Sequence, residues 1–172
     1  FEGSFSPDGT RIAYQPITKW QPDWKRARGG QNGRIWIARL SDSSIEAVPS
    51  EVSNDVRPVW MGDSVYFISD RNSSTGARSI FAWSSQSKQV RQILKNDGLD
   101  VKSMSAGPDA LVYEQFGTIF VRDPATGASK KVDIRVDGDF PGVRPRYVSV
   151  GTSLRSPRIS PPGARALFEA RG

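Results

Sequence analysis

The chain has 172 residues, of which 37% are hydrophobic, and its mean hydropathy of −0.48 is that of a soluble protein. It contains no apolar run of the roughly 18 residues that a membrane-spanning helix needs, so we expect no membrane partner. The net charge is +6, but Lys and Arg are spread along the chain and no nucleic-acid-binding motif occurs. We therefore expect no nucleic-acid partner.

The sequence contains neither histidine nor cysteine. A Ser–His or Cys–His dyad, a disulfide and a His-ligated metal site are therefore excluded within this chain, and only a carboxylate pair remains for acid–base chemistry. We expect no catalytic residue, no cofactor and no metal. The first residues do not resemble a signal peptide, which leaves cytoplasmic and periplasmic locations open. Because the sequence opens directly on a structural motif, we expect it to be cut from a longer chain.

The predicted elements are short β-strands. Apolar runs rich in Ile, Val, Tyr, Phe and Trp are bounded by Gly and Pro, and no stretch has helical periodicity over three turns. In chain order, the runs cover residues 11–14, 34–40, 64–69, 79–83, 110–114, 118–122 and 165–170. This pattern predicts an all-β protein.

A tight turn followed by an apolar strand recurs along the chain. The turns are Ser6-Pro7-Asp8-Gly9, Trp60-Met61-Gly62-Asp63, Gly107-Pro108-Asp109 and Ser160-Pro161-Pro162-Gly163. They begin near residues 6, 61, 107 and 160, a spacing of about 46 to 55 residues. The first three are followed by a second apolar strand, in Ile35-Trp36, Ile80-Phe81 and Ile119-Phe120, and then by a weaker one, such as residues 131–134. Units of this length are typical of four-stranded propeller blades.

The strands are apolar on both faces, as in the continuous run Val65-Tyr66-Phe67-Ile68. A sheet covered by other sheets on both faces has this pattern, whereas a half-solvated strand alternates. We therefore predict β-propeller blades of four antiparallel strands. Residues 1–134 form about three blades, the Pro/Gly-rich residues 135–156 form a connector, and residues 157–172 begin another blade. Three blades do not close a ring, so we expect the isolated fragment to self-associate.

The repeat resembles the TolB-like and WD40-like propeller repeats. Over longer stretches the chain is similar to the first, six-bladed propeller of tricorn-type serine peptidases, in residues 15–20, 25–31, 57–60, 62–71, 144–148 and 166–172. The resemblance implies a second, seven-bladed propeller and a peptidase core elsewhere in the parent chain. It implies that this chain is a non-catalytic segment with a scaffold and peptide-passage role. Its expected partners are the peptide substrate and the other domains of the parent chain.

The candidate binding residues are Lys25, Arg26 and Arg28, which lie in an insertion at residues 17–33. Arg side chains bind carboxylates with two parallel hydrogen bonds. The resemblance implies that adjacent basic residues of the first propeller anchor the C-terminal carboxylate of a peptide, and Lys25-Arg26 is the candidate pair. A solvated loop, or a loop packed on a neighbouring domain, is the alternative. Trp20 and Trp24 of the same insertion are expected to pin it to the propeller.

The remaining aromatic and acidic residues have structural interpretations. Aromatic side chains on the predicted strands are expected to pack between blades; these are Trp36, Trp60, Tyr66, Phe67 and Trp83. Carboxylates in or beside turns are expected to bond nearby backbone; these are Asp63, Asp70, Asp109 and Asp123. A free-standing TolB-like module that binds a protein partner is the alternative function. A propeller glycosidase or lyase would need a cluster of carboxylates or histidines at the blade mouths, which the sequence does not show.

Overall fold

The structure is a computed structural model that describes residues 2–16, 28–30, 32–50, 52–96, 98–147 and 149–170. The chain divides into two compact units, Phe1–Ile134 and Arg135–Gly172. None of the helices in the described residues has the length and apolar character needed to cross a membrane.

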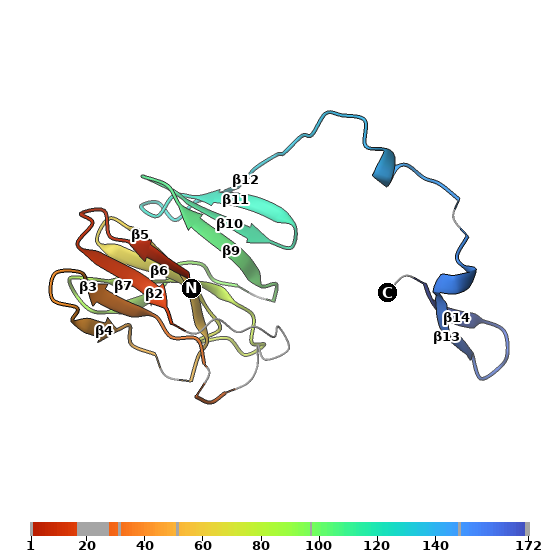
Figure 1. Ribbon diagram of the computed structural model, residues 1–172, viewed down its shortest axis with the longest axis horizontal. Helices are drawn as coiled ribbons and strands as arrows, with labels where there is room; N and C mark the ends of the chain where they lie inside the picture. The colour runs from red at the N-terminus through yellow and green to blue at the C-terminus, as the bar shows by residue number, and fades with distance from the viewer. Residues whose placement is uncertain are drawn as a thin grey trace. The chain divides into compact units, whose positions relative to one another are not determined.

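The described part of the first unit contains three four-stranded antiparallel sheets, in each of which the strands follow one another in chain order (Figure 1). The first sheet contains β1 (Glu2–Phe5), β2 (Arg11–Gln15), β3 (Trp36–Arg39) and β4 (Ile45–Ala47). The second contains β5 (Asp55–Met61), β6 (Ser64–Ser69), β7 (Ser79–Ser84) and β8 (Val90–Gln92). The third contains β9 (Val101–Ala106), β10 (Leu111–Gln115), β11 (Thr118–Arg122) and β12 (Ser129–Lys131).

The first strands of the three sheets lie next to one another. β5 contacts β1 and β2 of the first sheet and also β9 of the third. Three successive meanders with adjacent first strands have the arrangement of successive propeller blades. The prediction of an all-β chain with four-stranded propeller blades is confirmed.

The repeated turn has the geometry that its residues predict. The Gly9 N–H donates to the Ser6 carbonyl at 2.8 Å, and the φ of Gly9 is 67°, a value that glycine adopts without steric cost. The turn at Ser160 is equivalent, with a 2.8 Å bond from the Gly163 N–H and a φ of 73° at Gly163. In both turns the Ser hydroxyl accepts a 3.0 Å hydrogen bond from the N–H five residues later.

The second sheet is buried on both faces. One face belongs to a cluster with the first sheet that contains Val65, Phe67 and Trp83. The opposite face belongs to a cluster with the third sheet that contains Ile68 and Ile80. Neighbouring residues of one strand therefore enter different cores, which explains the continuous apolar run. Trp60, Tyr66, Phe67 and Trp83 are buried between sheets as predicted.

The first and third sheets each have a face that no sheet of the described first unit covers. On the first sheet, cross-strand pairing aligns Phe5, Ile12, Ala38 and Ile45 in one row, and Phe5 is 62% exposed. Trp36 lies in the adjacent row of this open face and is half-buried, so it differs from the prediction that it packs between blades. The third sheet is more polar, with a row of Ser105, Val112, Val121 and Lys130.

Some strands differ from the sequence prediction. The first strand of each sheet was not predicted, because β5 carries Arg57-Pro58 at a register shift and β9 carries Lys102 and two serines. The weak strand expected at residues 131–134 is instead β12 at Ser129–Lys131. Pairing with β11 sets this position, since Arg122 lies opposite Ser129 across the intervening turn.

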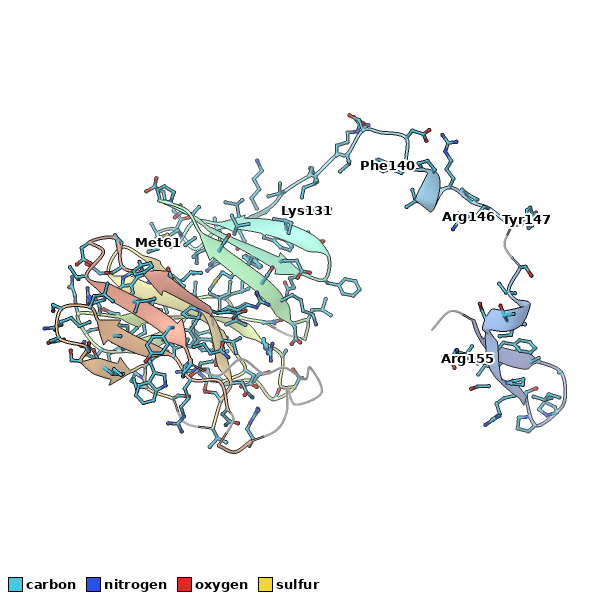
Figure 2. All side chains as sticks on the ribbon, in the orientation of Figure 1. Met61, Lys131, Phe140, Arg146, Tyr147 and Arg155 are labelled. Carbon is cyan, nitrogen blue, oxygen red and sulfur yellow. The ribbon has the colours of Figure 1, made fainter. Side chains whose placement is uncertain are left out.

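The second unit contains an antiparallel hairpin of β13 (Leu154–Ile159) and β14 (Ala166–Ala170). Two short 3-10 turns, Pro141–Val143 and Gly151–Ser153, precede it. Figure 2 shows Phe140, Arg146 and Tyr147 on the stretch between β12 and β13, and all three are exposed. β13 begins inside the 135–156 range expected as a connector, and the division into domains stays a prediction.

Candidate functional site

The basic insertion connects β2 to β3. The β6–β7 connection, which begins at Asp70, lies beside the described end of the insertion, since Asp70 contacts Arg28. Lys25 and Arg26, as well as Trp20 and Trp24, fall outside the described residues. Arg28 is the candidate binding residue that the structure describes.

Arg28 forms an ion pair with a buried carboxylate of the second sheet. Its Nη2 lies 3.1 Å from Oδ2 of Asp70, and the Asp70 side chain is only 1% exposed. The Asn54 backbone N–H and side-chain amide donate to the two Asp70 oxygens at 2.8 and 3.2 Å. A buried carboxylate is stable only where charges and donors compensate it. The Arg28 pair therefore joins the end of the insertion to the second sheet.

The chain after Arg28 is held at a second point. Gly29 and Asn32 close a tight turn, with bonds of 3.0 Å in both directions. The Gly33 N–H donates to Oδ1 of Asn54 at 3.3 Å, and the Gly33 carbonyl accepts from the Asp55 N–H at 2.9 Å. A Cβ on Gly33 would lie 2.7 Å from the Asp55 carbonyl oxygen, so only glycine permits this approach.

A second buried ion pair supports the same region. Nη2 of Arg71 lies 2.6 Å from Oδ2 of Asp55, whose side chain is 0% exposed. The hydroxyls of Ser53 and Ser69 donate to the other Asp55 oxygen at 3.1 and 2.6 Å. The Arg71 guanidinium also lies over the Phe67 ring, 5.0 Å from its centroid. Asp55 is thereby fully hydrogen-bonded, and its charge is neutralised within the sheet interface.

Arg28, Asp70 and Arg71 line a hollow of about 810 Å³, together with Ser53 and Phe81. Charged donors beside hydroxyls suit the recognition of carboxylates and peptide carbonyls. The described residues contain no group of three or more acidic side chains that could hold a metal ion. With no histidine in the sequence, a serine of this region has no imidazole base within the chain. Arg28 and Arg71, the charged donors at this hollow, each form an ion pair with a buried carboxylate.

The carboxylates in turns have structural partners. Asp123 accepts from the Ala125 N–H and from the Thr126 hydroxyl, both at 2.8 Å, and these bonds lower its pKa. The Ser6 hydroxyl and the N–H and hydroxyl of Thr10 lower the pKa of Asp8 to about 2. Asp63 differs from the expected bond to nearby backbone, since it accepts from the Gln86 side-chain amide at 2.6 Å. Asp70 differs from this turn interpretation, since it is buried and pairs with Arg28.

Sequence reasoning identified Arg28 but not its partner Asp70, nor the contacts of Asn54 with Asp70 and Gly33. Gly33, Asn54 and Asp70 lie far apart in the sequence. The available signals were the Asn54-Asp55 and Asp70-Arg71 pairs, which flank two strands that pair with each other. Only the pairing of β5 with β6 makes these two dipeptides neighbours.

Adjacent four-stranded meanders, with both faces of the middle one covered, define this chain as part of a β-propeller. The family model of the Tricorn protease N-terminal beta propeller domain matches residues 1–128. The chain therefore belongs to the family of tricorn protease N-terminal propeller domains.

Curated relatives agree with this assignment. The chain is 29% identical over 131 residues to Tricorn protease homolog 1 of Streptomyces coelicolor, covering 75% of this chain and 12% of the relative. It is 26% identical over 129 residues to the Tricorn protease homolog of Saccharolobus solfataricus, again covering 75% and 12%. The chain thus spans about an eighth of the length of these relatives.

Solved structures share the fold. A crystal structure of the tricorn protease matches with a TM-score of 0.67 and 24% identity, covering 88% of this chain and 14% of that one. A putative TolB from Agrobacterium tumefaciens matches with a TM-score of 0.59 and 16% identity, covering 76% of this chain and 49% of that one. At these identities the likeness concerns the fold.

Proposed function

We propose that this chain is a non-catalytic propeller segment of a tricorn-type peptidase, in which it acts as a scaffold and lines a passage for peptides. The observation that carries the proposal is the family match, which covers the three blades. The described site in these blades contains ion-pairing groups, and the sequence has no histidine to act as a base. The peptidase centre then belongs to another part of the parent chain.

The insertion binds the substrate in this proposal. Lys25 and Arg26 hold the C-terminal carboxylate of a peptide, and Arg28 follows them two residues later. Support comes from the described end of the insertion, where Arg28 is tied to Asp70 and Gly33 to Asn54. A cationic pair loses less binding energy to ordering when the chain beside it is already fixed.

The test uses a Lys25→Ala/Arg26→Ala double variant of the full-length parent enzyme. Two peptides that differ only in a free or an amidated C-terminus are its substrates. We expect KM for the free-acid peptide to rise about tenfold, while KM for the amide stays unchanged, because one lost charge-assisted contact corresponds to roughly that factor. An unchanged KM for the free-acid peptide contradicts the anchor.

The same proposal assigns roles to the two units. Residues 1–134 are three blades of the first propeller, residues 135–156 connect the propellers, and residues 157–172 begin the second. The apolar open face of the first sheet requires a further blade in the parent chain. In the isolated chain, a second copy covers it. The β13–β14 hairpin also needs more strands, since its apolar side chains Ile159 and Leu167 are 75% and 70% exposed.

Sedimentation equilibrium of the 172-residue chain tests this assembly. We expect a dimer that Ile45→Lys, on the open face of the first sheet, converts to a monomer. Ser41→Lys, which adds the same charge in an exposed turn, leaves the dimer intact. A well-folded wild-type monomer contradicts the pairing and favours a free-standing TolB-like module that binds a protein partner.

A further inference from the structure

We infer that Arg57 is a binding residue for peptide carboxylates, placed at the axis of the propeller. This inference rests on the proposed passage role and names the chemistry that the passage recognises. Arg57 belongs to β5, the first strand of the second sheet. β5 contacts β1 and β9, the first strands of the adjacent sheets. Because propeller blades surround a central channel, these adjacent first strands are the ones that lie nearest to it.

The Arg57 side chain projects from the unpaired edge of β5. The other edge of β5 pairs with β6, and both faces of the second sheet are covered. Val56 and Pro58 are buried on either side of Arg57, whereas the Arg57 side chain is 46% exposed. Its acidic neighbour is Glu2 of β1, another first strand. The exposed guanidinium therefore lies on the side of the sheet that faces the propeller axis.

A β-bulge brings the side chain to this edge. Arg57 and Pro58 together lie opposite the single residue Phe67 of β6, and a bulge of this kind redirects a side chain. The φ of Arg57 is 55°, a value that is costly for any residue except glycine. β13 also has a register shift, with a φ of 51° at Ser156 before Pro157. Since serine occupies that bulge, the backbone geometry itself does not require arginine.

The Arg57 guanidinium has donors that the described residues leave unused. Its Nη1 lies 3.9 Å from Oε1 of Glu2, which is beyond hydrogen-bond distance, and its side chain forms no hydrogen bond within the described part of the chain. The Glu2 side chain is 36% exposed, and an ion pair this exposed contributes little. A peptide carboxylate can therefore replace Glu2 and accept two parallel hydrogen bonds from the guanidinium.

The experiment measures the binding of three tripeptides to the 172-residue chain. Two are capped at both ends and have glutamate or glutamine as the central residue between alanines. The third has central glutamine and a free C-terminus. NMR titration of the Arg57 Nε–H gives each Kd. We expect the capped glutamine peptide to bind about tenfold more weakly than a peptide with a carboxylate, because one charge-assisted contact corresponds to roughly that factor. The tighter of the two carboxylate peptides shows whether the site prefers an acidic side chain or a C-terminus.

Three variants test the assignment to Arg57, with binding followed by the fluorescence anisotropy of labelled peptides. Arg57→Gln should raise Kd for the carboxylate peptides about tenfold. Arg91→Gln is the matched control and should leave Kd unchanged, because Arg91 is exposed on β8, the last strand of the same sheet. Glu2→Gln removes the competing carboxylate and should lower Kd about twofold to fivefold. An unchanged Kd in Arg57→Gln overturns the inference.

Arg57→Gly separates binding from a structural role. Glycine adopts a positive φ without steric cost, so we expect this variant to melt between the wild-type temperature and about 4 °C above it. It should lose carboxylate binding as Arg57→Gln does. A variant that melts clearly below the wild type would mean that arginine is kept at this bulge for the fold, which overturns the inference.

The full-length parent enzyme distinguishes this inference from the proposed function. A raised KM of its Arg57→Gln variant for glutamate peptides, with an unchanged KM for glutamine peptides, supports both. If the 172-residue chain needs Arg57 to bind carboxylates but the parent variant cleaves both peptides like the wild type, the site stands and the passage role fails. Equal or undetectable binding of the three tripeptides overturns the site, and the passage role then depends on its own test.

Discussion

The second and third sheets each have an Ile-Phe pair near the start of their third strand, but the two pairs differ in burial. Ile80-Phe81 lies near the start of β7, and Ile119-Phe120 has the same place in β11. Ile80 is 0% and Phe81 1% exposed, because a sheet covers each face of the second sheet. Phe120 stacks on Tyr113 on the covered face of the third sheet, with ring centroids 5.1 Å apart. Ile119 is only partly buried on the open face.

The first sheet gives the complementary case. Ile35 is fully buried against the second sheet, whereas Trp36 is half-buried on the open face. In the three sheets the isoleucine therefore points to the following blade and the aromatic residue to the preceding one. The isoleucine is buried where a following blade is present, and the aromatic residue is buried where a preceding blade is present. Each repeat forms a blade with two apolar faces. A face becomes part of the core only where an adjacent blade packs against it.

The largest effect is expected at the buried ion pair between Asp55 and Arg71, at one end of the second sheet. Arg71→Ala should lower the free energy of unfolding by about 3–5 kcal/mol, since it leaves Asp55 buried without its partner. Lys88→Ala is the control, because its 2.6 Å pair with Glu46 is half-exposed and contributes about 1 kcal/mol or less. Urea denaturation measures both. If Arg71→Ala and Lys88→Ala lowered the free energy of unfolding equally, Asp55 would not need Arg71 to compensate the burial of its charge.

The matched isoleucines test the comparison directly. Ile80→Ala should cost about 2–4 kcal/mol, because it opens a cavity between two sheets. Ile119→Ala should cost about 1 kcal/mol or less, because its face is open. Urea denaturation of the two variants, at a concentration where the chain is monomeric, measures the difference. A cost at Ile119 as large as that at Ile80 would mean that this face of the third sheet is covered even in the monomer.

Gly33→Ala tests the close contact between the insertion and the second sheet. The added Cβ would lie 2.7 Å from the Asp55 carbonyl oxygen, so the backbone must shift at an expected cost of about 1–3 kcal/mol. Gly30→Ala is the control, because no atom of the described residues lies within 4 Å of its Cβ position. Thermal melts of the two variants should differ clearly. A Gly33→Ala protein as stable as the wild type would refute the contact.

The smallest effect concerns pH and the repeated turn. Hydrogen bonds lower the pKa of Asp8 to about 2 from its ordinary value of 3.8. A depressed folded-state pKa stabilises the fold above pH 3.8, and this contribution is lost as the pH falls through about 2. Asp8→Asn should therefore melt slightly below the wild type at pH 7 and together with it at pH 2. A constant difference at every pH would exclude the carboxylate charge as the cause.

The strands that sequence analysis located are those with uninterrupted apolar runs. Residues 64–69 and 118–122 agree with β6 and β11 to the residue, and each run follows a tight turn that contains a glycine, Gly62 or Gly117. β9 was missed because Lys102 and Ser105 interrupt its pattern, and they do so because part of its surface faces away from the second sheet. In the candidate site, the basic residues were visible as a local cluster, whereas Asp70 became a partner of Arg28 only through folding.

The four-stranded blade and its repeat could be predicted from short segments of the sequence. Turn residues such as Gly9 act on their own backbone, and alternating side chains within a strand assign its two faces, so both depend on local geometry that short segments encode. Packing of the blades determined which faces are core, and it brought Asp70 to Arg28 and Asn54 to both Asp70 and Gly33. These contacts depend on which blades adjoin and on the register of β5 with β6, and neither is a property of a local segment.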